Sequence, residues 1–213
     1  MNITLVGCGN VAIVLARLCT TNGHKIKQVI ARNRTVREKF AANFNCSHIS
    51  FDEIPDKNID LVIVALSDIS MPEAIYPLNF GNIAVIHTAG ACGIDVIKTM
   101  STNYGVLYPL QSLRKEMEVI PEIPFLIEGS SIEMLQFIKT FAESISKNVA
   151  VMHGEERLKV HAAAVIVNNF TNYLFSVAEK YCVDEGLNFN LLLPLIKQTA
   201  EIVQNHSPLS VQT

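Results

Sequence analysis

A pair of glycines between a short apolar segment and a helical one constrains the fold more than any other feature. Residues 2–6 are mostly apolar, Gly7 and Gly9 follow, and residues 10–21 carry Val and Leu at helical spacing. In this G-x-G-x-x-A pattern the first glycine permits a tight turn, and the second lets the backbone approach a pyrophosphate. The third position needs a small residue for helix–strand packing, and Ala12 occupies it. The motif therefore predicts a strand–turn–helix unit that holds a dinucleotide at the helix N-terminus.

The residues expected to hold the pyrophosphate lie in this turn and at the start of the helix. They are Gly7, Cys8, Gly9, Asn10 and Val11. The alternative is a glycine turn in a Rossmann-like domain that has lost its ligand.

The end of the second predicted strand decides which dinucleotide is favoured. About 20 residues after the glycine motif, an NAD-binding unit carries an acid that hydrogen-bonds the ribose 2′-hydroxyl. This chain has Arg32, Asn33 and Arg34 there, and its first acid is Glu38. Two guanidinium groups can hold a 2′-phosphate, which a carboxylate would repel. The sequence therefore favours NADP over NAD, with two solvated loop arginines as the alternative.

Strand-like and helix-like segments alternate through the first 152 residues. Strands are expected at residues 2–6, 25–31, 61–66, 83–87, 104–108, 123–128 and 148–152, and helices at 10–21, 35–43 and 131–146. Capping-box spacing at Thr35–Glu38 and Ser70–Glu73 predicts helix starts. Alternation of this kind predicts βαβ units and an α/β fold of Rossmann type, with a doubly wound, mostly parallel sheet.

The pattern changes after Met152. Residues 154–182 and about 190–205 have the character of two helices. Two helices are too few to bury a core of their own. We therefore expect a Rossmann domain at 1–152 and an all-α domain at 153–213, which packs on the sheet, on a second subunit or on residues beyond Thr213.

Three segments are expected to follow strands at the carboxyl edge of the sheet, where open α/β proteins bind ligands. Ser67 and Asp68 would line the nicotinamide half of the cofactor, or else cap a helix. His87 could donate a proton, or could be an ordinary buried polar residue. Tyr108 and Gln111 could contact a substrate, or belong to a plain proline turn.

A polar stripe marks the first predicted helix of the C-terminal domain. Its members recur three or four residues apart and share one helix face: His161, Val165, Asn168, Asn172 and Phe175. Asparagine is a poor helix former, so its use in mid-helix is unusual. The stripe would form an active-site wall if it faces the ligand edge of the sheet, with a hydrogen-bonded subunit interface as the alternative.

Composition excludes several classes of protein and site. A net charge of −3 argues against a nucleic-acid or anionic-membrane partner. The five cysteines form no ligand-spaced set with histidine, so we expect free thiols in a reducing cytoplasm and no metal site. Met1 leads directly into an apolar strand and no apolar run reaches ~18 residues, so we expect neither a signal peptide nor a membrane span.

Several segments together resemble a known family. They are Gly7–Ala12, Ile30–Asn33, His87–Ala91, Tyr108–Gln111 and His161–Phe170. The chain resembles the Rossmann-like proteins that carry domain of unknown function 2520, a group similar to pyrroline-5-carboxylate reductases and deazaflavin-dependent NADP reductases. The resemblance covers nearly the whole chain. It implies an NADP-binding N-terminal domain and a helical C-terminal domain that usually builds a dimer, but no settled substrate.

Two departures from related proteins matter. Related hydroxyacid dehydrogenases often place a Lys–Asn pair on the first interdomain helix, where this chain has His161 and Asn168 at a different spacing. A proton-transfer role therefore cannot simply be copied from them. Members of the resembled group also usually continue past the position of Thr213 with further helices, so part of the pocket or the dimer interface is expected to be missing.

These observations predict a cytoplasmic NADP-dependent oxidoreductase that transfers a hydride between NADPH and a small carbonyl or imine substrate. His161 is the first choice of proton donor and His87 the second, and Asn168 completes the predicted catalytic set. A homodimer through the C-terminal helices is expected. One alternative is a non-catalytic NADP-binding redox sensor or scaffold, favoured by the lack of a recognised catalytic Lys or Tyr–Lys pair. The other is an imine reductase like pyrroline-5-carboxylate reductase.

Overall fold

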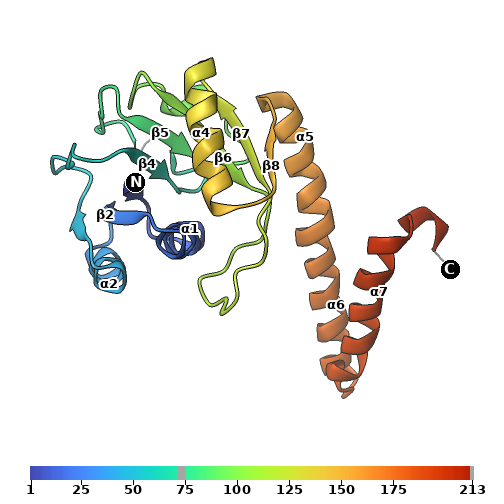
Figure 1. Ribbon diagram of the computed structural model, residues 1–213. Coiled ribbons are helices and arrows are strands. Elements are labelled where there is room, and N and C mark those ends of the chain that lie inside the picture. The colour runs from blue at the N-terminus through green and yellow to red at the C-terminus, as the bar shows by residue number, and fades with distance from the viewer. Residues whose placement is uncertain (72–74, 212–213) are drawn as a thin grey trace. The chain divides into compact units, whose positions relative to one another are not determined.

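A central sheet organises the N-terminal part of the chain (Figure 1). The computed structural model describes residues 1–71 and 75–211, and within them eight strands form one sheet in the order β3-β2-β1-β4-β5-β6-β7-β8. The strands are β1 Asn2–Val6, β2 Lys25–Ile30, β3 Ser47–Ile49, β4 Leu61–Val64, β5 Ala84–His87, β6 Tyr104–Pro109, β7 Phe125–Gly129 and β8 Val149–Val151. Neighbouring strands are parallel except β6 and β7. The first six follow the doubly wound order of a Rossmann sheet, which confirms the predicted α/β fold class.

Both faces of the sheet are buried. Leu5 of β1 and Ile63 of β4 point to the face covered by α1 (Asn10–Thr21), α2 (Arg34–Phe44) and α4 (Ile132–Ile145). Their neighbours Val6 and Val64 point to the opposite face, where Phe80 and other apolar side chains cover them. This alternation is the two-residue period of a strand, and it explains the continuous apolar run in β4.

The start of α2 differs from the prediction. The helix begins at Arg34, and its N-cap is Asn33, whose side-chain oxygen accepts a hydrogen bond of 3.1 Å from the Val36 amide. The prediction of a capping box that opens at Thr35 was wrong, because the helix has already begun at Arg34 and Thr35 lies inside its first turn. The predicted helix start at Ser70–Glu73 lies partly outside the described residues.

The chain divides between residues 163 and 164 rather than at the predicted position 152. Helix α5 (Gly154–Ala164) therefore belongs almost entirely to the unit that contains the sheet. The second unit begins with a π-helix at Val165–Phe170 and continues with α6 (Thr171–Asp184) and α7 (Leu193–Asn205), with short 3₁₀ helices at Phe189–Leu192 and Pro208–Ser210. The single long helix predicted over 154–182 is thus interrupted. Because a π-helix has a different period, the 3.6-residue spacing behind the predicted polar stripe does not hold through it.

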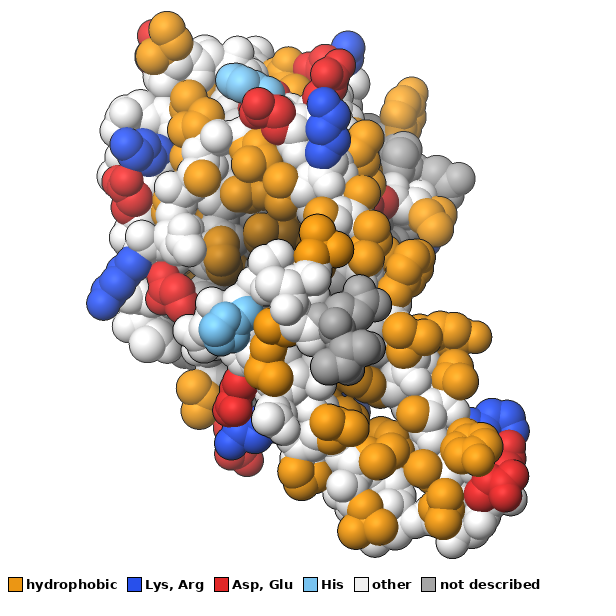
Figure 2. Space-filling model, turned by 90° about the vertical axis from the view of Figure 1, so that its right-hand side faces the viewer, with side chains coloured by type: hydrophobic (Ala, Val, Ile, Leu, Met, Phe, Trp, Pro, Cys, Tyr) orange, Lys and Arg blue, Asp and Glu red, His pale blue; other side chains and the backbone are white. Residues whose placement is uncertain are grey.

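Apolar side chains lie exposed over much of the second unit. Figure 2 shows them gathered over its helices. Tyr173, Leu174, Tyr181, Leu191 and Leu195 are each at least 61% exposed, whereas Cys182 is buried. Within the described residues, no helix is both long enough and apolar enough to cross a membrane. An apolar surface of this extent is typical of a face that another protein surface covers.

Candidate functional site

The turn between β1 and α1 has the geometry that the glycine motif predicts. Gly7 has a φ of +111°, and its amide donates a 2.8 Å hydrogen bond to the Ile30 carbonyl at the end of β2. A Cβ at Gly7 would lie under 3.0 Å from the carbonyl oxygen of Ala65, which follows β4. Gly7 is therefore the position where the chain needs both the left-handed backbone and the missing side chain.

Gly9 has a different role in the same turn. Its backbone is extended, and a Cβ added there would meet nothing within 4 Å. Gly9 is the N-cap of α1, which has no acidic residue in its first turn and no side-chain cap. Free amides at a helix N-terminus that face open space form a favourable binding site for a phosphate group. Because the space in front of Gly9 is open, a pyrophosphate fits this turn.

The side chains of Cys8 and Asn10 are already engaged within the protein. Burial raises the pKa of the Cys8 thiol to about 11, and its sulfur packs against the core. The Asn10 side-chain oxygen accepts a 3.3 Å hydrogen bond from the Lys115 amide, in the loop between β6 and β7. Arg17 of α1 holds the same loop through a 3.0 Å bond to the Glu118 carbonyl. Cys8 and Asn10 would therefore meet a pyrophosphate through their backbone amides.

The predicted 2′-phosphate residues lie at the end of β2, which pairs with β1 beside the glycine turn. Arg32 is exposed. Arg34 is exposed and pairs with Glu38 at 2.7 Å, while the Asn33 side chain caps α2. Arg37 donates to the Ala31 and Arg32 carbonyls, which fixes the loop. Because an exposed ion pair is weak, a phosphate could displace Glu38 from Arg34.

Tyr108 and His161 form a hydrogen-bonded pair at the carboxyl end of β6. The Tyr108 hydroxyl lies 2.8 Å from Nδ1 of His161, and the two rings are T-shaped with centroids 5.6 Å apart. Gly90, after β5, packs against both rings, and a Cβ there would lie 2.5 Å from His161 Nδ1. Tyr108 and His161 are candidate site residues in the sequence, and Gly90 lies in the segment His87–Ala91. Their contact could not be predicted from the sequence.

Arg157 holds α5 against the sheet, and the sequence analysis missed it. Its guanidinium is 1% exposed and pairs with Glu128 of β7, and it donates a 2.7 Å hydrogen bond to the Cys92 carbonyl. His161 follows one helical turn later, on the same face of α5. Extending the four-residue spacing backward from His161 would have found Arg157, which is an unusual residue to bury.

His87 lies at the end of β5 and is fully buried. Its Nδ1 accepts a 3.2 Å hydrogen bond from the Ala89 amide, and within the described part of the chain its Nε2 has no partner. Burial and the nearby Arg157 guanidinium lower the pKa of His87 to about 4. The ring is therefore neutral at pH 7, which makes it a weaker candidate than His161 for donating a proton.

Ser67 and Asp68 follow β4 at the same edge. The Ser67 carbonyl accepts hydrogen bonds from the amides of Ser70 and Met71, so Ser67 opens a turn, and its hydroxyl lies 2.5 Å from that of Ser70. Burial first, and the Asp68 carboxylate second, raise the pKa of Tyr108. The structure brings Gly90, Tyr108 and His161 into contact at this edge.

Asn168, the last predicted catalytic residue, belongs to the second unit. It lies in the π-helix, is exposed and donates a 2.8 Å hydrogen bond to the Asn169 side chain. Its catalytic role stays a prediction. Within residues 1–71 and 75–211, no cluster of three His, Cys, Asp or Glu side chains could hold a metal ion.

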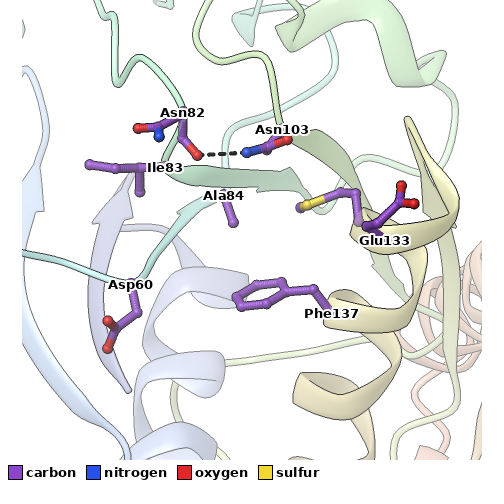
Figure 3. Close-up of a pocket in the computed structure, with 8 residues that line it drawn as sticks. Asp60, Asn82, Ile83, Ala84, Asn103, Glu133 and Phe137 are labelled. Carbon is purple, nitrogen blue, oxygen red and sulfur yellow. Dashed lines mark hydrogen bonds between the residues drawn. The ribbon is translucent and has the colours of Figure 1, made fainter.

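A hollow of about 300 Å³ lies at the opposite, amino-terminal edge of the sheet (Figure 3). Asp60, Asn82, Ile83 and Asn103 line it at the strand starts, and Phe137 of α4 closes one side. The Asn103 side chain donates a 2.7 Å hydrogen bond to the Asn82 carbonyl. The glycine turn and the Tyr108–His161 pair lie at the other edge, so this hollow is separate from the candidate site.

Comparison with known proteins identifies the family. The model of domain of unknown function 2520, DUF2520, matches residues 123–213. A protein from Bacteroides fragilis described as a candidate NADP oxidoreductase is 33% identical, with a TM-score of 0.92, over 100% of this chain and 83% of that one. This chain belongs to the DUF2520 family of Rossmann-like proteins. No curated protein matches the sequence of this DUF2520 protein.

More distant solved structures share the fold of this DUF2520 protein. The 1-pyrroline-5-carboxylate reductase of Streptococcus pyogenes is 16% identical, with a TM-score of 0.73, over 100% of this chain and 85% of that one. The imine reductase of Myxococcus stipitatus in complex with NADP⁺ is 12% identical, with a TM-score of 0.67, over 96% of this chain and 73% of that one. The DUF2520 protein therefore has a fold that oxidoreductases of this kind use.

Proposed function

We propose that this DUF2520 protein is an NADP-dependent oxidoreductase that transfers a hydride between NADPH and a small carbonyl or imine compound. The observation that carries the proposal is the open glycine turn in front of α1, at the same sheet edge as Arg32 and Arg34. The description of the Bacteroides fragilis relative as a candidate NADP oxidoreductase supports it. So does the NADP⁺ complex of the imine reductase that shares the fold.

The proposal assigns binding residues to each part of the cofactor. The backbone amides of Gly7, Cys8, Gly9, Asn10 and Val11 hold the pyrophosphate at the start of α1. Arg32 and Arg34 hold the 2′-phosphate, and the Asn33 side chain keeps their loop in place by capping α2. Ser67 and Asp68 flank the nicotinamide side after β4.

The bound cofactor would supply the hydride, and the protein would supply a proton and hold the substrate. His161 is the proton source that we favour, because it is half-buried and hydrogen-bonded at the candidate site. His87 is the second choice. Asn168 stays the third proposed catalytic residue.

Arg32→Ala/Arg34→Ala should weaken NADPH binding by about 10- to 100-fold and leave NADH binding nearly unchanged, because only NADPH carries the 2′-phosphate. Calorimetric titration with each cofactor measures both affinities. Lys25→Ala is the matched control, since it removes a cation from the opposite end of β2. Equal losses for both cofactors, or no loss for NADPH, would contradict the NADP assignment.

A non-catalytic redox sensor or scaffold is the rival in another class, and a pyrroline-5-carboxylate reductase is the enzymatic rival. Tight NADPH binding without turnover on a panel of small imines and carbonyls would favour the sensor. Turnover confined to 1-pyrroline-5-carboxylate would favour the reductase.

Free thiols at all five cysteines agree with a reducing compartment, so we propose a cytoplasmic location.

The second unit is proposed to pair with a second copy of the chain, because its exposed apolar helices need a cover. Light scattering after size-exclusion chromatography should give twice the 23.5 kDa chain mass. Leu174→Asp, which places a charge on a side chain 64% exposed, should shift the protein to monomers. Lys180→Asp on the same helix is the control and should leave the dimer intact. A monomeric wild-type protein would overturn this proposal.

A further inference from the structure

We propose that the hydroxyl of Tyr108 delivers the proton to the substrate and that His161 supplies that proton through Tyr108. The proposal rests on the oxidoreductase function proposed above and adds a residue and a route to it. Tyr108 becomes the catalytic residue that touches the substrate. His161 becomes a positioning residue behind it.

The geometry of the pair favours this division of roles. Tyr108 ends β6 at the carboxyl edge of the sheet, where ligands of such sheets bind. Its hydroxyl lies 2.8 Å from His161 Nδ1, within hydrogen-bond reach for a proton transfer. Nδ1 of His161 is thus occupied by the Tyr108 hydroxyl. A proton that leaves this nitrogen reaches the Tyr108 oxygen first.

The surrounding backbone is built to keep the pair together. Gly90 lies so close that a Cβ would stand 2.5 Å from His161 Nδ1 and 2.8 Å from two carbons of the Tyr108 ring. Arg157 fixes α5 one turn before His161 through its contacts with Glu128 and the Cys92 carbonyl. The two rings thus pack against Gly90 beside an anchored helix, which favours their hydrogen bond.

The electrostatic surroundings keep Tyr108 protonated before the reaction. Burial first, and the Asp68 carboxylate second, raise the pKa of Tyr108 above its usual range. The titratable and charged groups around the pair are Asp68 after β4, His87 of β5, Cys92 in the loop that follows, Glu128 of β7 and Arg157 of α5. Glu128 and Arg157 pair with each other and His87 is neutral, so Asp68 is the charge that acts on Tyr108.

Protons and electrons balance in the proposed step. A hydride, with its two electrons, reaches the carbon of a C=O or C=N bond, and the π electrons of that bond move to oxygen or nitrogen. That atom takes the proton of Tyr108 as its O–H bond breaks. The Nδ1–H bond of the His161 imidazolium then breaks, and its proton restores the hydroxyl. The substrate would be reduced and the bound cofactor oxidised, and after the product leaves a solvent proton would return to His161 through Tyr108.

The test combines three variants with two readouts. Tyr108→Phe removes the hydroxyl and keeps the ring, and His161→Asn keeps a polar atom near the Nδ1 position but has no ionisable proton to transfer. Tyr104→Phe is the matched control, because Tyr104 lies at the other end of β6 and its hydroxyl bonds Asp95. NADPH affinity is measured by calorimetry. NADPH oxidation is followed from pH 5 to 9 with 1-pyrroline-5-carboxylate, 1-pyrroline and a set of small aldehydes and ketones.

We expect Tyr108→Phe to lower kcat by about 10²- to 10⁴-fold with NADPH affinity unchanged. His161→Asn should lower kcat and alter its dependence on pH, and Tyr104→Phe should behave like the wild type.

Two results would overturn the route: Tyr108→Phe with wild-type kcat, or a wild-type protein that binds NADPH but oxidises it with no compound of the set. Failure of the wild type to bind NADPH would instead overturn the proposed function. The two failures are therefore distinguishable.

Discussion

Replacing Gly7 with alanine should destabilise the protein by about 3 kcal/mol or more, because the new side chain has no space and no allowed backbone. The φ of Gly7 is +111°. An added Cβ would lie under 3.0 Å from the Ala65 carbonyl oxygen and 3.1 Å from its carbon. These are backbone atoms directly after β4, so no side-chain rotation can relieve the clash. Urea denaturation of the wild type and Gly7→Ala measures the difference.

The same substitution two residues later should have a different result, which makes it the matched control. Gly9 has an extended backbone, and a Cβ there meets nothing within 4 Å. Because alanine is a poorer N-cap than glycine, Gly9→Ala should lower the free energy of unfolding by about 1 kcal/mol, well below the loss expected for Gly7→Ala. The methyl group would occupy the space where the pyrophosphate approaches, so NADPH affinity should fall at least about tenfold. Wild-type NADPH affinity in Gly9→Ala would place the pyrophosphate elsewhere.

The second large effect is expected from Arg157→Met. Arg157 is 1% exposed, and its partner Glu128 has a side chain only 12% exposed. Removal of the cation leaves a nearly buried carboxylate with only the exposed His153 ring at 3.6 Å beside it, and breaking such a buried pair costs about 3–5 kcal/mol. Denaturation in urea should show this loss. Lys139→Met is the control, because Lys139 and Glu143 form an exposed pair at 3.7 Å whose removal should change stability by less than about 1 kcal/mol.

The Arg157 variant has a second readout that stability alone does not give. Arg157 is the second cause, after burial, that lowers the pKa of His87 to about 4. In Arg157→Met the pKa of His87 should rise but stay below the usual 6.5, since the ring remains buried. NMR titration of the imidazole measures it. An unchanged His87 pKa together with unchanged stability would contradict the account of Arg157 as the buried cation that holds α5.

The fold was predictable because its main signals are local. The glycine motif, the strand that became β4 and the helix over residues 10–21 each depend on a few neighbouring residues, and the structure has them where the sequence indicated. The start of α2 was mispredicted, since Asn33 and Thr35 both carry capping side chains and only the backbone decides between them. Strand β3 was missed because only one of its three residues, Ile49, is apolar, and the other two are exposed.

The candidate site was predictable as a set of residues and not as an arrangement. Tyr108 and His161 are 53 positions apart, and nothing in the spacing indicates that their polar atoms meet. Arg157 was missed because a buried arginine is recognisable only from its partner, Glu128, 29 positions earlier. The loop that binds Asn10 and Arg17 through backbone groups has no side-chain pattern to predict it. These long-range contacts form only when the chain folds.

The central claim, that the glycine edge of the sheet binds NADPH, is tested most directly by NMR of the backbone amides during a titration with NADPH. The largest shift changes should fall on Gly7, Gly9 and Arg32. Asn82 and Asn103, which line the hollow at the opposite edge, should not change and serve as an internal control. Changes centred on Asn82 and Asn103, or no changes at Gly7 and Gly9, would contradict the claim.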